Sequence, residues 1–184
     1  MSDRYTHPDR EWSGPWFTLG RLEMGTTEVV TGLGLVSFLV LAIAPSVAGA
    51  LALYPANVVR GAVWQVATWP LANLPSLWTL LSLAMFWYFG RELEREVGRT
   101  RWAAWLGIVT LGSGILVLVA AALVGGGSIG GIGTLATLVM VLFIAEHPQL
   151  KFWFGIPAWV IGIVLVALPL LQLLAARALS LIHI

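Results

Sequence analysis

The chain has 184 residues, of which 59% are hydrophobic and 10% are charged, whereas soluble domains average about 45–50% and about 25%. A soluble domain this small cannot bury so much apolar surface, so the composition excludes a soluble globular or a disordered protein and indicates a polytopic membrane protein. The net charge of +1 argues against a nucleic-acid partner, and the absence of cysteine removes disulfides and thiolate chemistry.

The N-terminal third predicts a tail, one membrane helix and an interfacial segment. Residues 1–28 carry three Arg, two Asp and three Glu, without a signal-peptide pattern, and are expected to form a polar tail. The uncharged stretch that follows predicts a first membrane helix over 29–54. Residues 60–75 mix tryptophan, proline and polar side chains, which favours a segment that lies in the membrane interface.

The remaining apolar stretches predict four more helices, the first two over 76–90 and 102–124. Five of the seven residues of the glycine loop, 125–131, are glycine. The helix after the loop covers only 132–145, roughly 21 Å at about 1.5 Å per residue, which is too short to span a membrane. Its first residue is therefore expected to lie inside the membrane, where irregular backbone requires cover from protein or water. The fifth helix is predicted over 152–176.

Basic residues predict the orientation. Eight of the ten Lys and Arg residues fall on one side of these helices, which places the N-terminal tail in the cytoplasm. The interfacial segment and the glycine loop then share the external side and are able to face one another. Arginine outnumbers lysine nine to one, a bias typical of GC-rich bacterial genomes, so the expected location is a bacterial plasma membrane.

The last six residues, 179–184, read like the translation of a sequencing-library adapter. We therefore expect the membrane domain to cover 29–178 and the natural chain to continue beyond Ala178. His183 is expected to carry no function.

Three motifs stand out in the middle of the chain. The first is a W-x-x-x-T stretch, the second an FG-x-x-LE-x-x-x-G run, and the third an IPAW segment. The residues that carry them are Trp64, Thr68, Phe89, Gly90, Leu93, Glu94, Gly98 and 156–159. Together these motifs resemble the rhomboid superfamily of intramembrane proteins. A short fourth helix entered through glycine is also a rhomboid feature. The resemblance covers about a hundred residues and implies an all-α, six-helix rhomboid-like bundle, of which five helices are visible.

The family's proteases use a serine at the start of helix four and a histidine on helix six. Here the expected nucleophile position falls on Ile132 or Gly133, neither of which can attack a carbonyl. The family's oxyanion-stabilising His and Asn correspond to Trp78 and Ser82. Its usual arginine after the first tryptophan is replaced by Gln65, while the matching Glu94 implies a bracing role for loops.

Ser128 is the serine nearest to the expected nucleophile and defines an alternative reading, in which it pairs with a histidine on the unseen helix. His7 lies in the tail, and His147 lies at the opposite end of the short helix. The resemblance also implies a cleft beside that helix, open to transmembrane segments of client proteins. Its predicted lining is small residues: Gly126, Gly130, Gly131, Gly133 and Thr137.

The leading hypothesis is a non-catalytic rhomboid-like membrane protein that binds the transmembrane helices of clients within the lipid bilayer. The alternatives are an intramembrane serine endopeptidase that uses Ser128, and a structural membrane protein. The predicted membrane helices contain no charged residue and no cluster of His and carboxylate side chains, so neither ion coupling nor a metal or other cofactor is expected.

Overall fold

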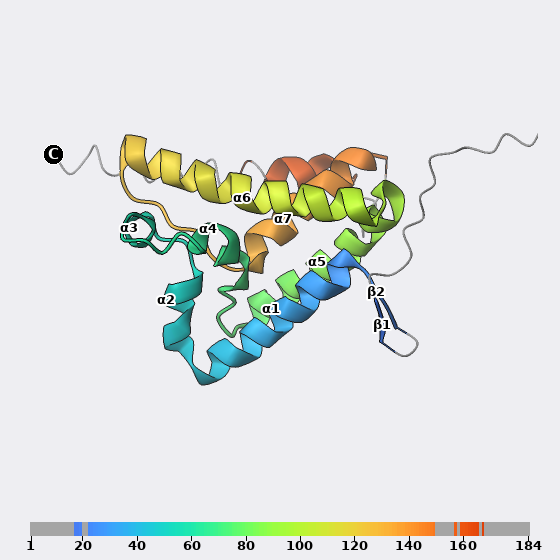
Figure 1. The fold of residues 1–184 in the computed structure, drawn as a ribbon. Coiled ribbons are helices and arrows are strands. Elements are labelled where there is room, and N and C mark those ends of the chain that lie inside the picture. Colours follow the sequence, from blue (N-terminus) through green and yellow to red (C-terminus); the bar gives the residue numbers. More distant parts are fainter. Residues whose placement is uncertain (1–16, 20–21, 150–156, 158, 166, 168–184) are drawn as a thin grey trace, which may run out of the picture.

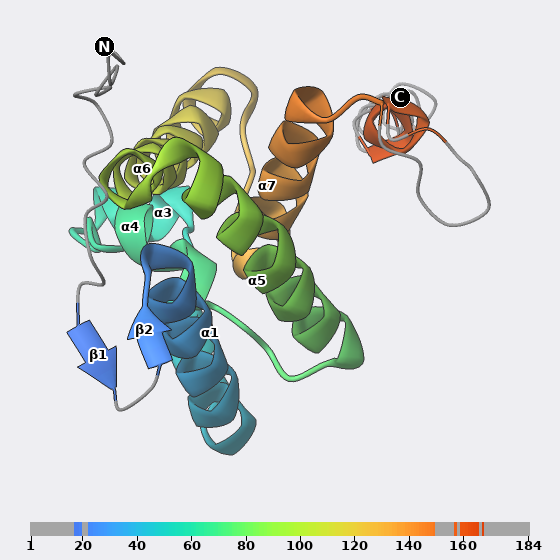
Figure 2. The same cartoon turned by 90° about the vertical axis from the view of Figure 1, so that its right-hand side faces the viewer.

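The fold is a bundle of long helices connected by short helical pieces and loops (Figures 1 and 2). The structure is a computed structural model that describes residues 17–19, 22–149, 157, 159–165 and 167. The described chain begins with a hairpin of β1 (Phe17–Leu19) and β2 (Leu22–Met24), in which Phe17 pairs with Met24. Beyond this hairpin the described regular structure is helical, which agrees with the all-α class expected from the sequence.

The first long helix, α1, covers Thr26–Ile43. The prediction of 29–54 was wrong at its C-terminal end, because Pro45 disfavours helical geometry at the preceding residue and lacks the N–H that the next turn needs. The chain then turns through η1 (Pro45–Val47) and α2 (Ala48–Leu51). The first three residues of α1 also belong to the stretch predicted as a polar tail, 1–28.

Three short helical pieces follow: α3 (Pro55–Val59), α4 (Gln65–Thr68) and η2 (Trp69–Leu71). α4 and η2 lie within the predicted interfacial segment, 60–75, whereas α3 precedes it, and the three pieces pack between α1 and α6 (Figure 1). Pro55 stands at the first position of α3 and Pro70 within η2, and Gly61, with φ +104°, follows the end of α3, so proline and glycine mark the breaks along this irregular path.

Helices α5 (Leu77–Val97) and α6 (Arg99–Val124) are joined at Gly98. The hydroxyl of Ser76 caps α5 by accepting the Thr79 N–H at 3.0 Å. The prediction of 76–90 ended α5 too early, since the charged RELEREV stretch continues the helix with one buried face. Gly98 has φ +91°, a conformation open to glycine at little cost, and it lets α6 start directly.

The short helix α7 covers Ile132–Glu146, within one residue of the predicted 132–145. It packs chiefly against α5, and their interface holds most of the core, including Phe86, Leu93 and Val139, each 0% exposed. The predicted fifth helix, 152–176, lies largely outside the described residues, although 159–165 and 167 are helical.

Among the described residues, α1 and α6 are long and apolar enough to cross a membrane. Only 28% and 11% of their most apolar stretches are buried within the chain, so most of their apolar surface faces outward. Helix α7 is shorter than a membrane span, as predicted. Five membrane-spanning helices were expected from the sequence, and among the described residues two helices meet the length and hydropathy required of a span.

Candidate functional site at the entrance of α7

The glycine loop makes backbone hydrogen bonds to Leu53 and to the predicted interfacial segment, 60–75. Leu53 and Ile129 form an antiparallel bridge, with N–H to O distances of 2.9 and 3.2 Å. The Gly131 N–H then donates to the carbonyl of Trp69 at 2.8 Å. The two segments therefore face one another, as the sequence predicted, and together they fix the point at which α7 starts.

Asn73 completes this anchor. Its Oδ1 accepts the Ile132 N–H at 2.8 Å and so caps α7, while its Nδ2 donates to the Ser37 hydroxyl at 2.9 Å and to the Pro70 carbonyl at 3.0 Å. The side chain is 1% exposed. One buried amide thus ties α1, η2 and α7 together. The sequence analysis did not single out Asn73, and its only signal is an amide in an apolar, proline-flanked stretch.

Two of the predicted cleft glycines contact the chain itself. A Cβ on Gly130 would lie 3.2 and 3.3 Å from the methyl groups of Ala52 and Ala72. Gly131 has φ +84°, and a Cβ there would lie 3.3 Å from the Ala72 carbonyl oxygen. Gly126, by contrast, is exposed and has nothing within 4 Å of its Cβ position. Gly130 and Gly131 therefore allow the close approach of two backbones.

The expected nucleophile position lies beside the expected oxyanion position. A Cβ on Gly133 would lie 3.5 Å from the Ser82 hydroxyl, and Ser82 is 7% exposed. Ile132 is fully buried, and Thr137 donates to the Gly133 carbonyl at 2.9 Å within α7. No atom at position 133 can act as a nucleophile, because glycine has no side chain.

Trp78 precedes Ser82 by one helical turn on the same face of α5. This face packs on α7 further along, where the rings of Phe89 and Phe143 lie 4.9 Å apart. At Trp78 the same face is open, and the side chain is 73% exposed. The α7-facing side of α5 therefore ends in a large apolar group that the described chain leaves uncovered.

Ser128 and His147 lie at opposite ends of α7. Ser128 is exposed in the glycine loop, whereas the His147 Nε2 lies 3.1 Å from Glu96 and its ring stacks on Phe143. His7 and His183 fall outside the described residues. In the part of the chain that the structure describes, no histidine lies at the Ser128 end of α7, and no three His, Cys, Asp or Glu side chains gather to hold a metal.

Gln65, at the position where the resemblance leads us to expect an arginine, is 1% exposed and organises the turn before α3. Its Nε2 donates to the Gly49 carbonyl at 3.0 Å, and its Oε1 accepts the Tyr54 N–H at 3.1 Å. The amide therefore supplies both a donor and an acceptor to a buried turn, which an arginine side chain cannot do.

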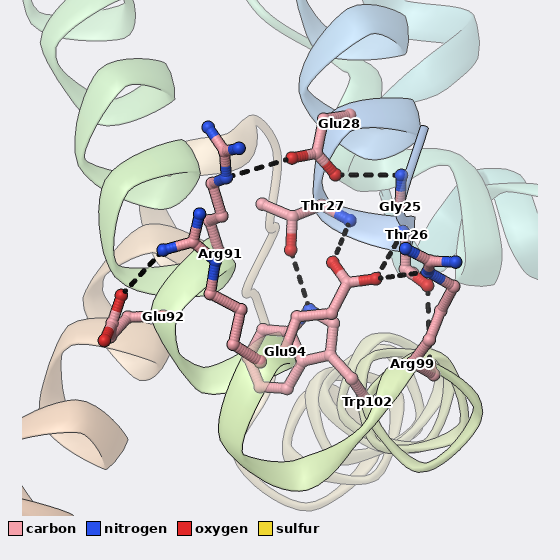
Figure 3. Close-up of polar contacts among 10 residues, drawn as sticks. Gly25, Thr26, Thr27, Glu28, Arg91, Glu92, Glu94, Arg99 and Trp102 are labelled. Carbon is pink, nitrogen blue, oxygen red and sulfur yellow. Dashed lines mark hydrogen bonds and ion pairs between the residues drawn. The ribbon is translucent and has the colours of Figure 1, made fainter. Parts of the chain in front are cut away.

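The opposite end of the bundle is held by Glu94, as Figure 3 shows. Its two carboxylate oxygens accept the N–H groups of Thr26 and Thr27 at 2.7 and 2.8 Å, at the first turn of α1. Arg99 lies 3.4 Å from the same carboxylate, and the Trp102 indole donates to the Thr27 hydroxyl at 2.9 Å. Through these contacts Glu94 acts as a brace that holds the start of α1 against the junction of α5 and α6.

Comparisons with protein-family models, with curated proteins and with solved structures each find no match to this chain.

Proposed function

We propose that this chain is a non-catalytic, rhomboid-like integral membrane protein that binds transmembrane segments of client proteins at the entrance of α7. We place it in a bacterial plasma membrane with its N-terminal tail in the cytoplasm. The proposal includes the five membrane helices predicted within this sequence, in a rhomboid-like arrangement.

The observation that carries the proposal is the open continuation of the α5 face at Trp78. A client helix lying there would cover the Trp78 indole, which is 73% exposed. It would also lie close to the Ser82 hydroxyl and to the backbone of Gly133, where no side chain stands in the way. Helices in lipid associate through close packing at small residues and through hydrogen bonds, and this site offers both. Glycine at the expected nucleophile position favours binding without cleavage.

The membrane placement is supported by the outward faces of α1 and α6. Large apolar side chains stand open along both helices, among them Val36 at 58%, Leu39 at 61%, Ile108 at 70% and Leu116 at 68% exposure. Apolar patches of this extent on a monomeric soluble protein are rare, whereas lipid covers them at no cost.

The test reconstitutes the full chain in vesicles with a labelled model helix of leucine that carries a stripe of glycine and alanine. Energy transfer between helix and protein is measured for the parent chain, for Trp78→Ala and for Trp87→Ala. Trp87 is the matched control because it lies on the same helix, is 40% exposed and packs against Arg91. We expect binding that Trp78→Ala weakens and Trp87→Ala leaves intact, with the model helix uncut.

If the two variants bind the model helix equally well, the client-binding site does not include Trp78. Cleavage of the model helix would contradict the non-catalytic assignment and would favour the protease alternative.

A further inference from the structure

The polar side-chain groups of residues 64–68 turn inward. The Trp64 indole N–H donates to the Ala50 carbonyl at 3.0 Å, the Gln65 amide donates to the Gly49 carbonyl at 3.0 Å, and the Thr68 hydroxyl donates to the Leu51 carbonyl at 3.1 Å. Each donor is therefore satisfied by the backbone of α2. A surface whose donors are already paired loses no hydrogen bond when it leaves water.

The outward surface of the same region is mainly apolar and carries one cation, with the partly exposed Asn57 as its neutral polar side chain. Val59 is 89% exposed, Val63 65%, Trp64 54% and Tyr54 44%. Arg60 stands exposed among them and is the only charged residue between Val29 and Gly90. No ion pair of Arg60 occurs among the described residues. We call Tyr54, Val59, Arg60, Val63 and Trp64 the Val59 surface.

The Val59 surface lies where the two long apolar helices end. Helix α3 packs against α6 near its Val124 end, and it follows the end of α1 at Ile43 by way of α2 (Figures 1 and 2). If α1 and α6 span the bilayer, this level is the boundary between hydrocarbon and headgroups. Tryptophan and tyrosine favour that boundary, and an arginine there extends its head to the phosphates.

We propose that the Val59 surface inserts into the external leaflet and that Arg60 binds the phosphate of an anionic phospholipid. This inference rests on the membrane placement of the proposed function but not on client binding. The aliphatic side chains supply the buried area, the aromatic rings lie at the headgroup level, and the single cation supplies the preference for anionic lipid. If the experiments instead find a second copy of the chain or a client protein bound to this surface, the lipid proposal is wrong.

The first experiment measures depth. Because the chain contains no cysteine, single cysteines at Val59, Val63, Leu116 and Ser128 accept a spin label cleanly. In vesicles of phosphatidylcholine with phosphatidylglycerol, collision with oxygen is compared with collision with a water-soluble nickel chelate. We expect Leu116 to report the hydrocarbon, Val59 and Val63 to report the region just below the headgroups, and Ser128 to serve as the exposed polar reference.

The outcomes separate the two proposals. If Leu116 meets the nickel chelate as readily as Ser128, the membrane placement itself is wrong. If Leu116 lies in hydrocarbon but Val59 and Val63 meet the chelate, only the insertion is wrong. Dipolar broadening between labels at Val59 in separate copies would show a second chain on this surface and would overturn the lipid assignment.

The second experiment tests the phosphate contact. Quenching of a fluorophore at Val59 by brominated phosphatidylglycerol is compared with quenching by brominated phosphatidylcholine. The local preference for the anionic lipid is expected to reach up to about fivefold, the size typical of one basic residue at a charged membrane surface. Arg60→Gln is expected to abolish the preference and Arg60→Lys to retain it. A preference unchanged in Arg60→Gln, or one removed by added inorganic phosphate, would contradict the lipid phosphate as the partner.

Discussion

At the scale of single residues, Asn73 is the side chain on which the α7 entrance depends most directly. Replacing it with alanine leaves the Ile132 N–H without its acceptor in a site that is 1% exposed and removes the link to Ser37. Because a buried group left unpaired costs about 1–3 kcal/mol, we expect Asn73→Ala to lower the free energy of unfolding by about 3 kcal/mol.

Unfolding of the purified protein in mild detergent, titrated with a denaturing detergent, measures this loss. Asn57→Ala is the control, since no side-chain hydrogen bond of Asn57 occurs among the described residues. Equal losses in the two variants would mean that the Asn73 contacts contribute nothing specific.

Gly131 tests the backbone of the loop. An alanine there must keep φ near +84° and must place its methyl 3.3 Å from the Ala72 carbonyl, so we expect Gly131→Ala to destabilise the fold by about 1–3 kcal/mol. Gly107→Ala, in open space on α6, is the opposite case and is expected to stabilise by up to about 1 kcal/mol. The same unfolding titration measures both changes, and a neutral Gly131→Ala would show that the loop relaxes freely.

The sequence singled out the glycine loop but not the residues that hold it in place. Glycine density made 125–131 visible, whereas Asn73 and Gln65 act through buried hydrogen bonds with segments distant in sequence. Such partners depend on how α1, α4 and α7 pack, and hydropathy does not encode that packing. The client-binding roles of Gly126 and Thr137 stay predictions.

At the scale of helices, Glu94 takes the place of a cap for α1. Its carboxylate accepts two N–H groups at the positive end of the helix and is 8% exposed. Hydrogen bonds to charged groups are worth about 1.5–3 kcal/mol each, so Glu94→Ala is expected to cost about 3–5 kcal/mol of unfolding free energy. Glu94→Gln, which keeps one acceptor oxygen, is expected to cost less.

Glu92 provides the matched control for Glu94. It lies on the same helix and pairs with Arg95 at 3.5 Å, but the two side chains are 51% and 62% exposed. An exposed pair of this kind contributes under about 1 kcal/mol, so Glu92→Ala is expected to unfold almost like the parent. The brace assignment fails if Glu94→Ala is as stable as Glu92→Ala.

The helix predictions succeeded where glycine and proline marked the ends and failed where charge was taken as the marker. Gly131 and Pro148 bound α7 closely, so the predicted 132–145 was accurate. The first helix was extended to Tyr54 because no charge marks its end, although Pro45 does. Charge caused the opposite error in α5, since RELEREV looks like a loop by hydropathy yet keeps Leu93 and Glu94 buried.

At the scale of the whole molecule, the polar anchors separate into two ends. Glu94 joins the start of α1 to the α5–α6 junction, and Glu96 reaches the end of α7 through His147. Asn73 and the Leu53–Ile129 bridge hold the other end, where α6 finishes and α7 begins. Between the two ends lie the exposed apolar faces of α1 and α6. This arrangement is the one expected if the hydrocarbon core of a bilayer surrounds the middle of the molecule.

This separation makes the membrane orientation testable on intact cells. Arg101, beside the Glu94 end, and Ser128, in the glycine loop, are both exposed and lie at the two ends of α6. With cysteine introduced at either position, we expect a membrane-impermeant maleimide to label Ser128→Cys from outside and Arg101→Cys only after permeabilisation. This follows because the chain concentrates its arginines at the Arg101 end, and basic residues stay cytoplasmic. The reverse pattern would invert the orientation, and labelling of both positions from the same side would show that α6 does not cross the membrane.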